Sequence, residues 1–190
     1  MTQLVRAAAR CLALALAVLA LPLICPAPAP AQEPIVVGAN LSMTGPVSAF
    51  GQMAWDGMQI AQQMRPTVLG RPVKLVLVDN KSDNVESANA AGRLVTKEKV
   101  VAMLGPVTSS ATLAAAPIVE EARVPLVSPS ATNPIVTQGK KYIFRVCFID
   151  PFQGQVAARH AYQNLGSRRA AVLIDISQDY AVGLAAFFKR

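Results

Sequence analysis

Two short stretches of the chain are rich in hydroxyl side chains and contain no charged residue. They are LGPVTSSAT, from Leu104 to Thr112, and VSPSATNP, from Val127 to Pro134. Such a row can supply a nucleophile, hold a phosphate or bind another small polar ligand. A nucleophilic serine needs a base and an orienting acid, and a phosphate dianion usually recruits lysine or arginine. Because both stretches lack these partners, they favour reversible binding of a small polar ligand.

The rest of the chain contains no catalytic or phosphate-binding motif that would supply these partners. No Gly-x-Ser-x-Gly elbow, phosphate-binding P-loop or Gly-x-Gly-x-x-Gly fingerprint is present. The single histidine, His160, lies in AARHAYQNL, where we expect an exposed or half-buried helix residue. Cys147 is the only cysteine after residue 31, which excludes a disulfide framework, and we expect its thiol to be a buried small hydrophobe. We therefore expect a binding protein that is not an enzyme and needs no metal or cofactor.

The first 31 residues have the pattern of a signal peptide. Arg6 and Arg10 precede an apolar run over residues 11–24, and Ala29-Pro30-Ala31 is the expected cleavage site. The run is shorter than the roughly 20 apolar residues of a membrane-spanning helix. A lipoprotein signal at Cys25 is the less favoured alternative, because no small residue precedes it. The sequence therefore predicts an exported protein that is cleaved after Ala31.

The chain carries a formal net charge of +7. Its basic residues are interleaved with acidic ones, and Lys140-Lys141 and Arg168-Arg169 are the only basic doublets after residue 31. Scattered charge does not form the basic patch that nucleic-acid binding needs, and an exported protein rarely meets nucleic acid. We therefore interpret the charge as a contribution to solubility.

Apolar strand patterns alternate with helical patterns along the mature chain. Strands are expected near 35–40, 73–79, 100–105, 124–128, 142–148 and 169–175, and helices near 52–64, 83–97, 110–122, 152–165 and 180–190. Asp83 and Glu86 have the capping-box spacing of a helix start, and Pro117 predicts a kink. The first four strands are almost continuously apolar, which indicates a flavodoxin-like α/β fold with a parallel sheet covered by helices on both faces.

Three hydroxyl-rich loops follow strands of this predicted sheet. They span residues 41–51, 105–110 and 128–133. The carboxyl ends of parallel strands share one edge, where ligands bind in open α/β sheets. Ser109 and Ser110 also stand at a helix start, whose free N–H groups favour an anion, although Ser110 and Thr132 are equally compatible with ordinary caps and turns. Three such loops at one edge favour a site for a zwitterion or another small polar solute.

Three longer segments carry a family resemblance. They are IVVGANLSMTGPVSAFGQMAWDGMQIA, LGPVTSSATLAAAPIVEEARVPLVSPSATNP and FRVCFIDPFQGQVAA. Together they resemble the periplasmic branched-chain amino-acid binding proteins, the type I solute receptors of ABC importers. The resemblance covers nearly all of residues 33–190, and the combination of G-P-x-x-x-x-G, G-x-x-x-S-S-x-T and S-P-x-A-T-N is its most specific part. It implies a type I periplasmic-binding-protein fold, a ligand held between two lobes, and delivery to an inner-membrane ABC permease.

The resemblance also implies ligand contacts at positions of this sequence. Ser109 matches a serine that binds the ligand carboxylate, and Ser130 matches the position whose backbone carbonyl accepts from the ammonium. Thr132 matches a threonine that contacts both groups. Phe50 matches an aromatic residue packed on the ligand side chain, and Tyr180 resembles the first contact from the opposite lobe. Without the resemblance, Phe50 is also compatible with a core anchor for the first helix.

The sequence departs from the family pattern in two respects. Ser82 and Thr108 stand where some members have cysteines that join two loops by a disulfide. The chain also holds only a first lobe, residues 32–145, followed by a crossover and an incomplete start of the second lobe, residues 146–190. We therefore expect ligand binding by this chain alone to be weak or absent.

An incomplete second lobe has two further consequences. We expect the strand RAAVLID to have no sheet to join, and Leu184, Phe187 and Phe188 to be exposed to water. Two other protein classes stay open. One is a ligand-sensing domain of a receptor or regulator on the same fold, and the other is an exported α/β hydrolase that takes its histidine and acid from additional residues.

Overall fold

The computed structural model describes residues 32–190, so the predicted signal peptide and its cleavage site lie outside the described residues. Residues 33–190 form one compact unit. In chain order its elements are β1 (Ile35–Leu41), α2 (Ser48–Met64), β2 (Thr67–Val68), β3 (Arg71–Asp79), α3 (Asn84–Thr96), β4 (Ala102–Leu104), α4 (Ser109–Ala122), β5 (Leu126–Ser128), the 3-10 helix η2 (Pro134–Val136), β6 (Ile143–Arg145), α5 (Asp150–Gln163) and α6 (Asp179–Phe188). Within the described range, no helix combines the length and the apolar character needed to cross a membrane.

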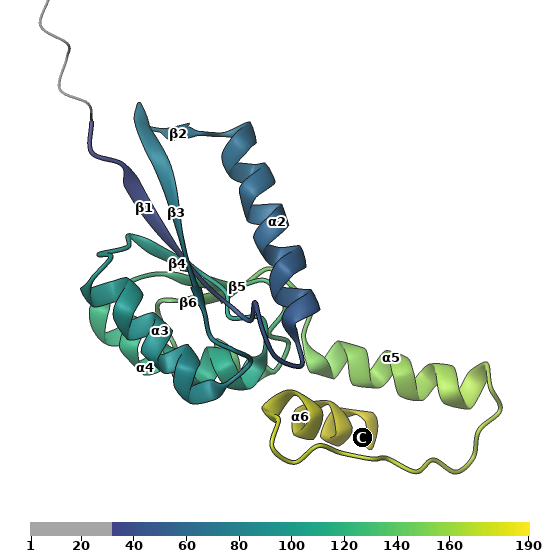
Figure 1. Cartoon of the computed structure of the whole chain (residues 1–190). Helices are drawn as coiled ribbons and strands as arrows, with labels where there is room; N and C mark the ends of the chain where they lie inside the picture. The colour runs from purple at the N-terminus through teal and green to yellow at the C-terminus, as the bar shows by residue number, and fades with distance from the viewer. Residues whose placement is uncertain (1–31) are drawn as a thin grey trace, which may run out of the picture. The chain divides into compact units, whose positions relative to one another are not determined.

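The strands form one six-stranded sheet in the order β2-β3-β1-β4-β5-β6 (Figure 1). All neighbouring pairs are parallel except β2 and β3, where the two-residue β2 runs antiparallel at the edge. The predicted parallel α/β architecture is therefore confirmed. Because β1 lies between β3 and β4, the loops that leave these strands emerge next to one another.

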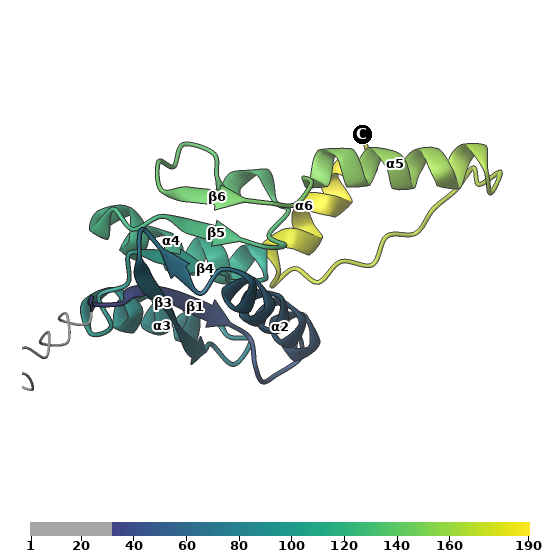
Figure 2. The ribbon, with the colours of Figure 1, turned by 90° about the horizontal axis from the view of Figure 1, so that it is seen from above.

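Strand β1 shows how the two faces of the sheet are divided. Ala39 and Leu41 are fully buried in a cluster that includes Trp55 of α2. The alternating position Asn40 faces the opposite side, where its amide donates to Ser87 of α3. Helices α3 and α4 pack side by side on that face, and α2 covers the other (Figure 2). The period-2 alternation of a strand thus directs one residue set to each helical layer.

Helix starts follow local capping chemistry. Asp83 accepts a hydrogen bond from the backbone N–H of Glu86 at 2.9 Å, as the capping box predicts. Thr108 caps α4 by accepting from the N–H of Ala111 at 3.2 Å, so this helix begins at Ser109, one residue before the predicted start. Helix α2 begins at Ser48, four residues before the predicted start, which shortens the first loop.

The end of the chain corrects two predictions. Residues 169–175 form no strand, because no neighbouring strand pairs with their backbone groups, and Leu173 is fully exposed. The expectation that Leu184, Phe187 and Phe188 are exposed is also wrong, since all three are half-buried where α6 folds back onto α5. Gly154 of α5 permits this contact, because a Cβ there would lie 2.7 Å from the Phe187 Cβ.

Candidate functional site

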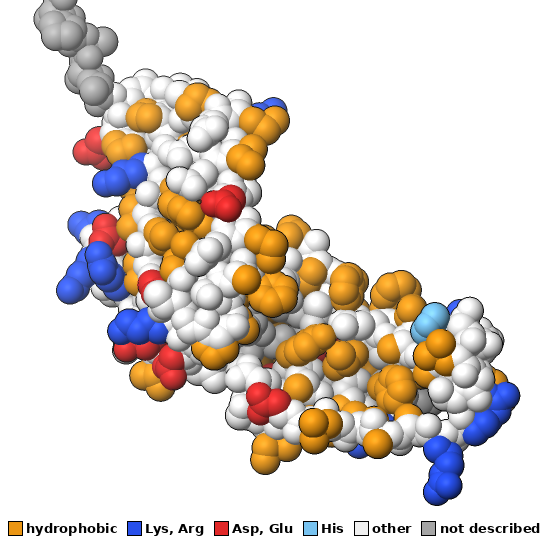
Figure 3. Space-filling model, turned by 45° about the vertical axis from the view of Figure 1, so that its right-hand side comes forward, with side chains coloured by type: hydrophobic (Ala, Val, Ile, Leu, Met, Phe, Trp, Pro, Cys, Tyr) orange, Lys and Arg blue, Asp and Glu red, His pale blue; other side chains and the backbone are white. Residues whose placement is uncertain are grey.

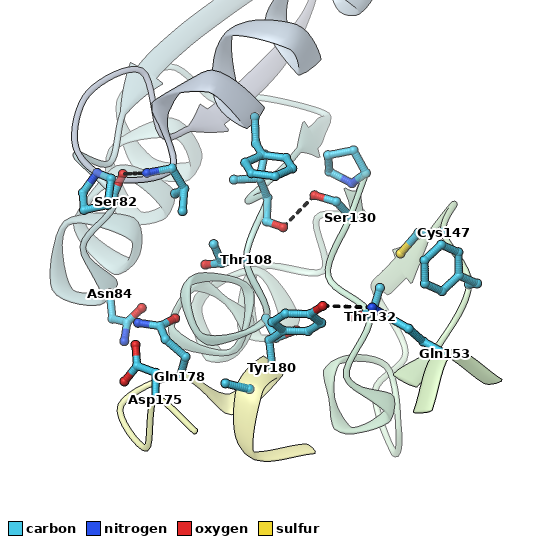
Figure 4. A pocket seen from close by; sticks show the side chains of 18 residues that line it. Ser82, Asn84, Thr108, Ser130, Thr132, Cys147, Gln153, Asp175, Gln178 and Tyr180 are labelled. Atoms are coloured by element: carbon cyan, nitrogen blue, oxygen red, sulfur yellow. Dashed lines mark hydrogen bonds between the residues drawn. The ribbon is translucent and has the colours of Figure 1, made fainter. Parts of the chain in front are cut away.

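A cavity of about 780 Å³ opens beyond the carboxyl ends of the strands. Its walls come from the loops after β1, β3, β4, β5 and β6 and from the starts of α5 and α6. Five of the six predicted site residues line it, from four separate segments: Phe50, Ser109, Ser130, Thr132 and Tyr180. Figure 4 shows Ser130, Thr132 and Tyr180 around the same space. Among the lining residues of the described chain, Asp175 is the only one with a charged side chain.

The sixth predicted residue, Ser110, does not line the cavity. Its hydroxyl donates to Asp179 Oδ2 at 2.8 Å and accepts from the Asp179 backbone N–H at 2.9 Å. Asn133 adds a bond from its amide nitrogen to the Asp179 carbonyl at 2.7 Å. Ser110 therefore fastens the start of α4 to the start of α6, across 69 positions of sequence.

The start of α4 gives the cavity its electrostatic character. Ser109 is 1 % exposed, and its hydroxyl accepts from the backbone N–H of Asn133 at 3.2 Å. The first N–H groups of a helix have no partner within the helix and carry partial positive charge. No lysine or arginine lines the cavity among the residues described. The arrangement suits a single carboxylate better than a phosphate dianion.

The loop after β5 is held by serine hydroxyls. Ser128 donates to the Pro106 carbonyl at 2.6 Å and accepts from the N–H of Ala131 at 3.1 Å. Ser130 donates to the Val107 carbonyl at 2.6 Å. The Ser130 hydroxyl is therefore used to join two loops, which leaves its backbone carbonyl as the group that a ligand can use.

Arg145 fixes the same loop from β6, a role that the sequence did not suggest. Its guanidinium donates to the carbonyls of Ala131 (2.8 Å), Asn133 (2.9 Å) and Pro134 (3.2 Å) and to Thr137 Oγ1 (2.8 Å). The planar fork of arginine suits several fixed acceptors at once. The available sequence signal was an arginine inside an otherwise apolar strand, in YIFRVCF.

Asp79, at the end of β3, fixes the first loop. Its carboxylate accepts from the N–H groups of Met43 (2.9 Å), Thr44 (3.3 Å) and Lys81 (2.8 Å) and from the Thr44 hydroxyl (2.7 Å). Burial raises the pKa of this carboxyl, but the hydrogen bonds from Thr44, Lys81 and Met43 outweigh it, and the pKa is lowered overall. The segment that leads to Phe50 is therefore anchored by an ionised side chain.

A buried polar chain connects the loops after β1 and β3 with α4. Ser42 donates to Asn80, whose amide donates to Asn40 at 2.9 Å. Asn40 donates to the Ser87 carbonyl at 2.9 Å, and the Ser87 hydroxyl donates to the Ala111 carbonyl at 2.8 Å. All four side chains are fully buried. The loop geometry is thus coupled to the helix that carries Ser109.

The remaining residues singled out in the sequence fall in different places. Cys147 lines the cavity and is half-buried, so the prediction of a buried thiol is wrong; desolvation by burial raises the pKa of this thiol. Ser82 and Thr108 line the same cavity. His160 is exposed on α5, as predicted, and appears in pale blue in Figure 3. Residues 32–190 contain no group of three or more potential metal ligands.

A family model described as periplasmic binding protein matches residues 34–188. The chain belongs to the periplasmic binding protein family. An amino acid binding protein of Pseudomonas aeruginosa is 33% identical over 155 residues, which cover 80% of this chain and 41% of that protein. The match confirms the resemblance found in the sequence, and the family consists of solute-binding proteins rather than enzymes.

Two solved structures share the fold of this family member. A leucine binding protein of Thermotoga maritima is 55% identical, with a TM-score of 0.80, over 82% of this chain and 44% of its own. The substrate binding protein of a branched-chain amino acid transporter of Streptococcus pneumoniae, solved with isoleucine, is 36% identical, with a TM-score of 0.78, over 83% of this chain and 46% of its own. The chain therefore spans less than half the length of these relatives.

Proposed function

We propose that this periplasmic binding protein is the substrate-binding component of an ABC importer for a branched-chain amino acid or a related small amino acid or amide. The observation that carries the proposal is the convergence of five predicted residues from four segments on one cavity with a single charged lining residue among the residues described. The ligand class is supported by the relatives: one is a leucine binding protein, and the other was solved in complex with isoleucine.

In this proposal the ligand carboxylate lies at the start of α4. There it meets the Ser109 hydroxyl and the free N–H groups of the first helical turn. The ligand ammonium lies against the Ser130 carbonyl and the Thr132 hydroxyl, which are acceptors. Phe50 and Tyr180, 58 % and 38 % exposed, offer aromatic surface to the ligand side chain. Ser110 acts through the contact of α4 with α6 and not on the ligand.

The same proposal includes the location and domain plan of the protein. Residues 1–31 would be a signal peptide cleaved after Ala31, and the mature protein would act in the periplasm with an inner-membrane ABC permease as its partner. Residues 32–145 would form the ligand-binding lobe, and residues 146–190 the crossover and the start of a second lobe. The packing of α5 on α6 supports a boundary between β6 and α5.

The test is a nuclear magnetic resonance titration of the chain from Gln32, which retains the whole compact unit. The ligands are leucine, valine and a control sugar. Because one lobe leaves the ligand partly solvated, we expect weak binding, with a Kd on the order of 1 mM or about −4 kcal/mol. The shifted amides should belong to Ser109, Ser130 and Thr132, and the sugar should shift none of them.

Two further measurements locate the site. Ser109→Ala should weaken leucine binding about tenfold, the size expected for a hydrogen bond to a charged group, whereas the matched control Ser167→Ala should not. Leucine should also slow alkylation of Cys147, followed by mass spectrometry of its peptide, because this thiol lines the cavity. Equal shifts with leucine and the control sugar, or leucine-specific shifts confined to amides away from Ser109, Ser130 and Thr132, would overturn the proposal.

A further inference from the structure

Four side-chain oxygen atoms beside the cavity are buried and make no hydrogen bond. They are Thr132 Oγ1, both carboxylate oxygens of Asp150, and Gln153 Oε1. Asp150 is fully buried and Thr132 is 7 % exposed. Buried polar groups are nearly always paired, so an unpaired cluster calls for an explanation. All four atoms accept hydrogen bonds, and only the Thr132 oxygen also carries a proton to donate.

The backbone places Asp150 directly next to Thr132. The Asp150 N–H donates to the Thr132 carbonyl at 3.1 Å. Helix α6 covers the carboxyl, since a Cβ on Gly183 would lie 3.4 Å from Asp150 Oδ2. Thr132 lines the cavity and Asp150 does not. The carboxyl can therefore influence a ligand only through a neighbouring side chain.

The surroundings of Asp150 determine its charge. Burial is the largest effect and raises the pKa of the carboxyl, while the Thr132 hydroxyl and the Arg145 charge lower it, and the pKa is raised overall. Arg145 gives its hydrogen bonds to backbone carbonyls and Thr137, so it attracts the carboxylate without pairing with it. Asp150 also stands in the first turn of α5, where a negative charge is favoured. These two effects favour the ionised form and oppose the effect of burial.

We propose that Asp150 is a positioning residue that draws the Thr132 hydroxyl proton away from the cavity. A carboxylate only accepts, so the single proton of the hydroxyl turns to Asp150 and its lone pairs face the ligand. Thr132 then favours a ligand that carries an N–H donor, such as an ammonium. The inference rests on the proposed function and explains how the site distinguishes an amino acid from its deaminated analogue.

Gln153 repeats this arrangement on the same wall. Its Nε2 donates to the Tyr180 hydroxyl oxygen at 3.0 Å, so the amide orientation is fixed with Oε1 unpaired. Thr132 and Gln153 both line the cavity. Two acceptors, Thr132 Oγ1 and Gln153 Oε1, thus stand at one side of the cavity, which favours ligand N–H groups on this side.

The experiment compares leucine with 4-methylpentanoate, which lacks the ammonium. In the chain from Gln32 we expect leucine to bind about tenfold more tightly, as for one charge-assisted hydrogen bond. Asp150→Asn and Thr132→Val should each remove most of this preference and leave 4-methylpentanoate binding within about twofold. The double variant should be no worse than Thr132→Val alone, because Asp150 acts through Thr132. Thr132→Ser, which keeps the hydroxyl, should restore the preference, and the exposed Asp56→Asn controls for loss of charge.

Several outcomes would overturn the inference. Equal weakening of both ligands by Asp150→Asn would show a structural role, and additive losses in the double variant would show that Asp150 does not act through Thr132. A second readout needs no ligand: carbon-13 titration of the Asp150 carboxyl should show it ionised at pH 7, with its pKa raised further in Thr132→Val. A protonated Asp150 at pH 7 would refute the mechanism. If the titration behaves as expected but leucine does not bind, the proposed function fails while the contact stands.

Discussion

Asp79 and Asp150 both lie near the loops that surround the cavity, but their carboxyl groups have opposite hydrogen bonding and opposite pKa shifts. The Asp79 carboxylate accepts four hydrogen bonds and has a lowered pKa, whereas the fully buried Asp150 carboxylate has only the Thr132 hydroxyl as a neighbouring donor and has a raised pKa. One stands at the end of a strand and meets loop N–H groups, and the other stands at the start of a helix beneath α6.

This difference in hydrogen bonding distinguishes the residues that hold the loops in place (the scaffold) from the residues beside the cavity (the site). Around Asp79, and in the buried chain of Asn40, Ser42, Asn80 and Ser87, every polar side chain has a partner, so the loops have one geometry. Around Asp150 two of the unpaired acceptors, Thr132 Oγ1 and Gln153 Oε1, belong to residues that line the cavity. A folded protein keeps such groups at a cost in stability, which is typical of positions retained for function.

The largest expected loss of stability comes from a substitution in the scaffold, Gly51→Ala. In this variant the added Cβ would overlap the Ser42 carbonyl oxygen, a backbone atom, so the backbone would have to shift. We expect the free energy of unfolding to fall by about 3 kcal/mol or more. Gly57→Ala is the matched control on α2, with no atom within 4 Å of its Cβ, and should add roughly 0.5–1 kcal/mol through helix propensity. Urea unfolding measures the free energy of unfolding of both variants. Equal values for Gly51→Ala and Gly57→Ala would contradict the close packing at Gly51.

Arg145→Lys removes the hydrogen bonds that hold the loop after β5, beside the cavity, while keeping the positive charge. A lysine cannot reproduce the fork that holds the carbonyls of Ala131, Asn133 and Pro134. We expect a loss of about 2–3 kcal/mol, because buried carbonyls lose charged donors. The exposed Arg168→Lys should change stability by less than about 0.5 kcal/mol. Denaturation midpoints that coincide for the two variants would show that the Arg145 fork does not hold the loop.

Asp79→Asn sharpens the comparison through its pH dependence. The amide nitrogen cannot accept from Thr44, so we expect a loss of about 1–2 kcal/mol at pH 7. A lowered pKa means that the ionised carboxyl contributes stability above its ordinary value of 3.8, which is lost as the pH falls through the folded-state pKa. The gap between wild type and variant, measured by unfolding from pH 7 to pH 3, should therefore narrow toward low pH. A gap that widens there would contradict the assignment.

Asp150→Asn should show the opposite sign and the smallest effect. A raised pKa means that ionisation destabilises the folded state, so the carboxyl's contribution is full below pH 3.8 and is lost as the pH rises through its folded-state pKa. We expect the variant to be about 1 kcal/mol more stable at pH 7, at the low end of gains from replacing buried charge. The gain should vanish near pH 3. A variant less stable than wild type at pH 7 would show that Asp150 supports the fold.

Much of the fold could be predicted because it depends on local patterns. The Asp83 cap requires only a residue three positions away, and the order of strands and helices along the chain follows from alternating apolar runs. The segment 169–175 has the apolar pattern of a strand and was expected to have no sheet to join; without a partner strand it forms no strand at all. Leu184, Phe187 and Phe188 were misplaced for a related reason, since their burial depends on how α6 meets α5.

The sequence by itself determined the order of elements and the loops that meet at one edge of the sheet, because parallel strands release their chains on the same side. It thereby located Ser109, Ser130 and Thr132 on one cavity. Only the tertiary structure decided which polar groups are paired. Ser110 meets Asp179, Arg145 reaches the loop after β5, and Asp150 is buried next to the Thr132 hydroxyl. A hydrogen bond between distant residues depends on distance and angle within a fraction of an ångström, and residue type alone does not encode that distance.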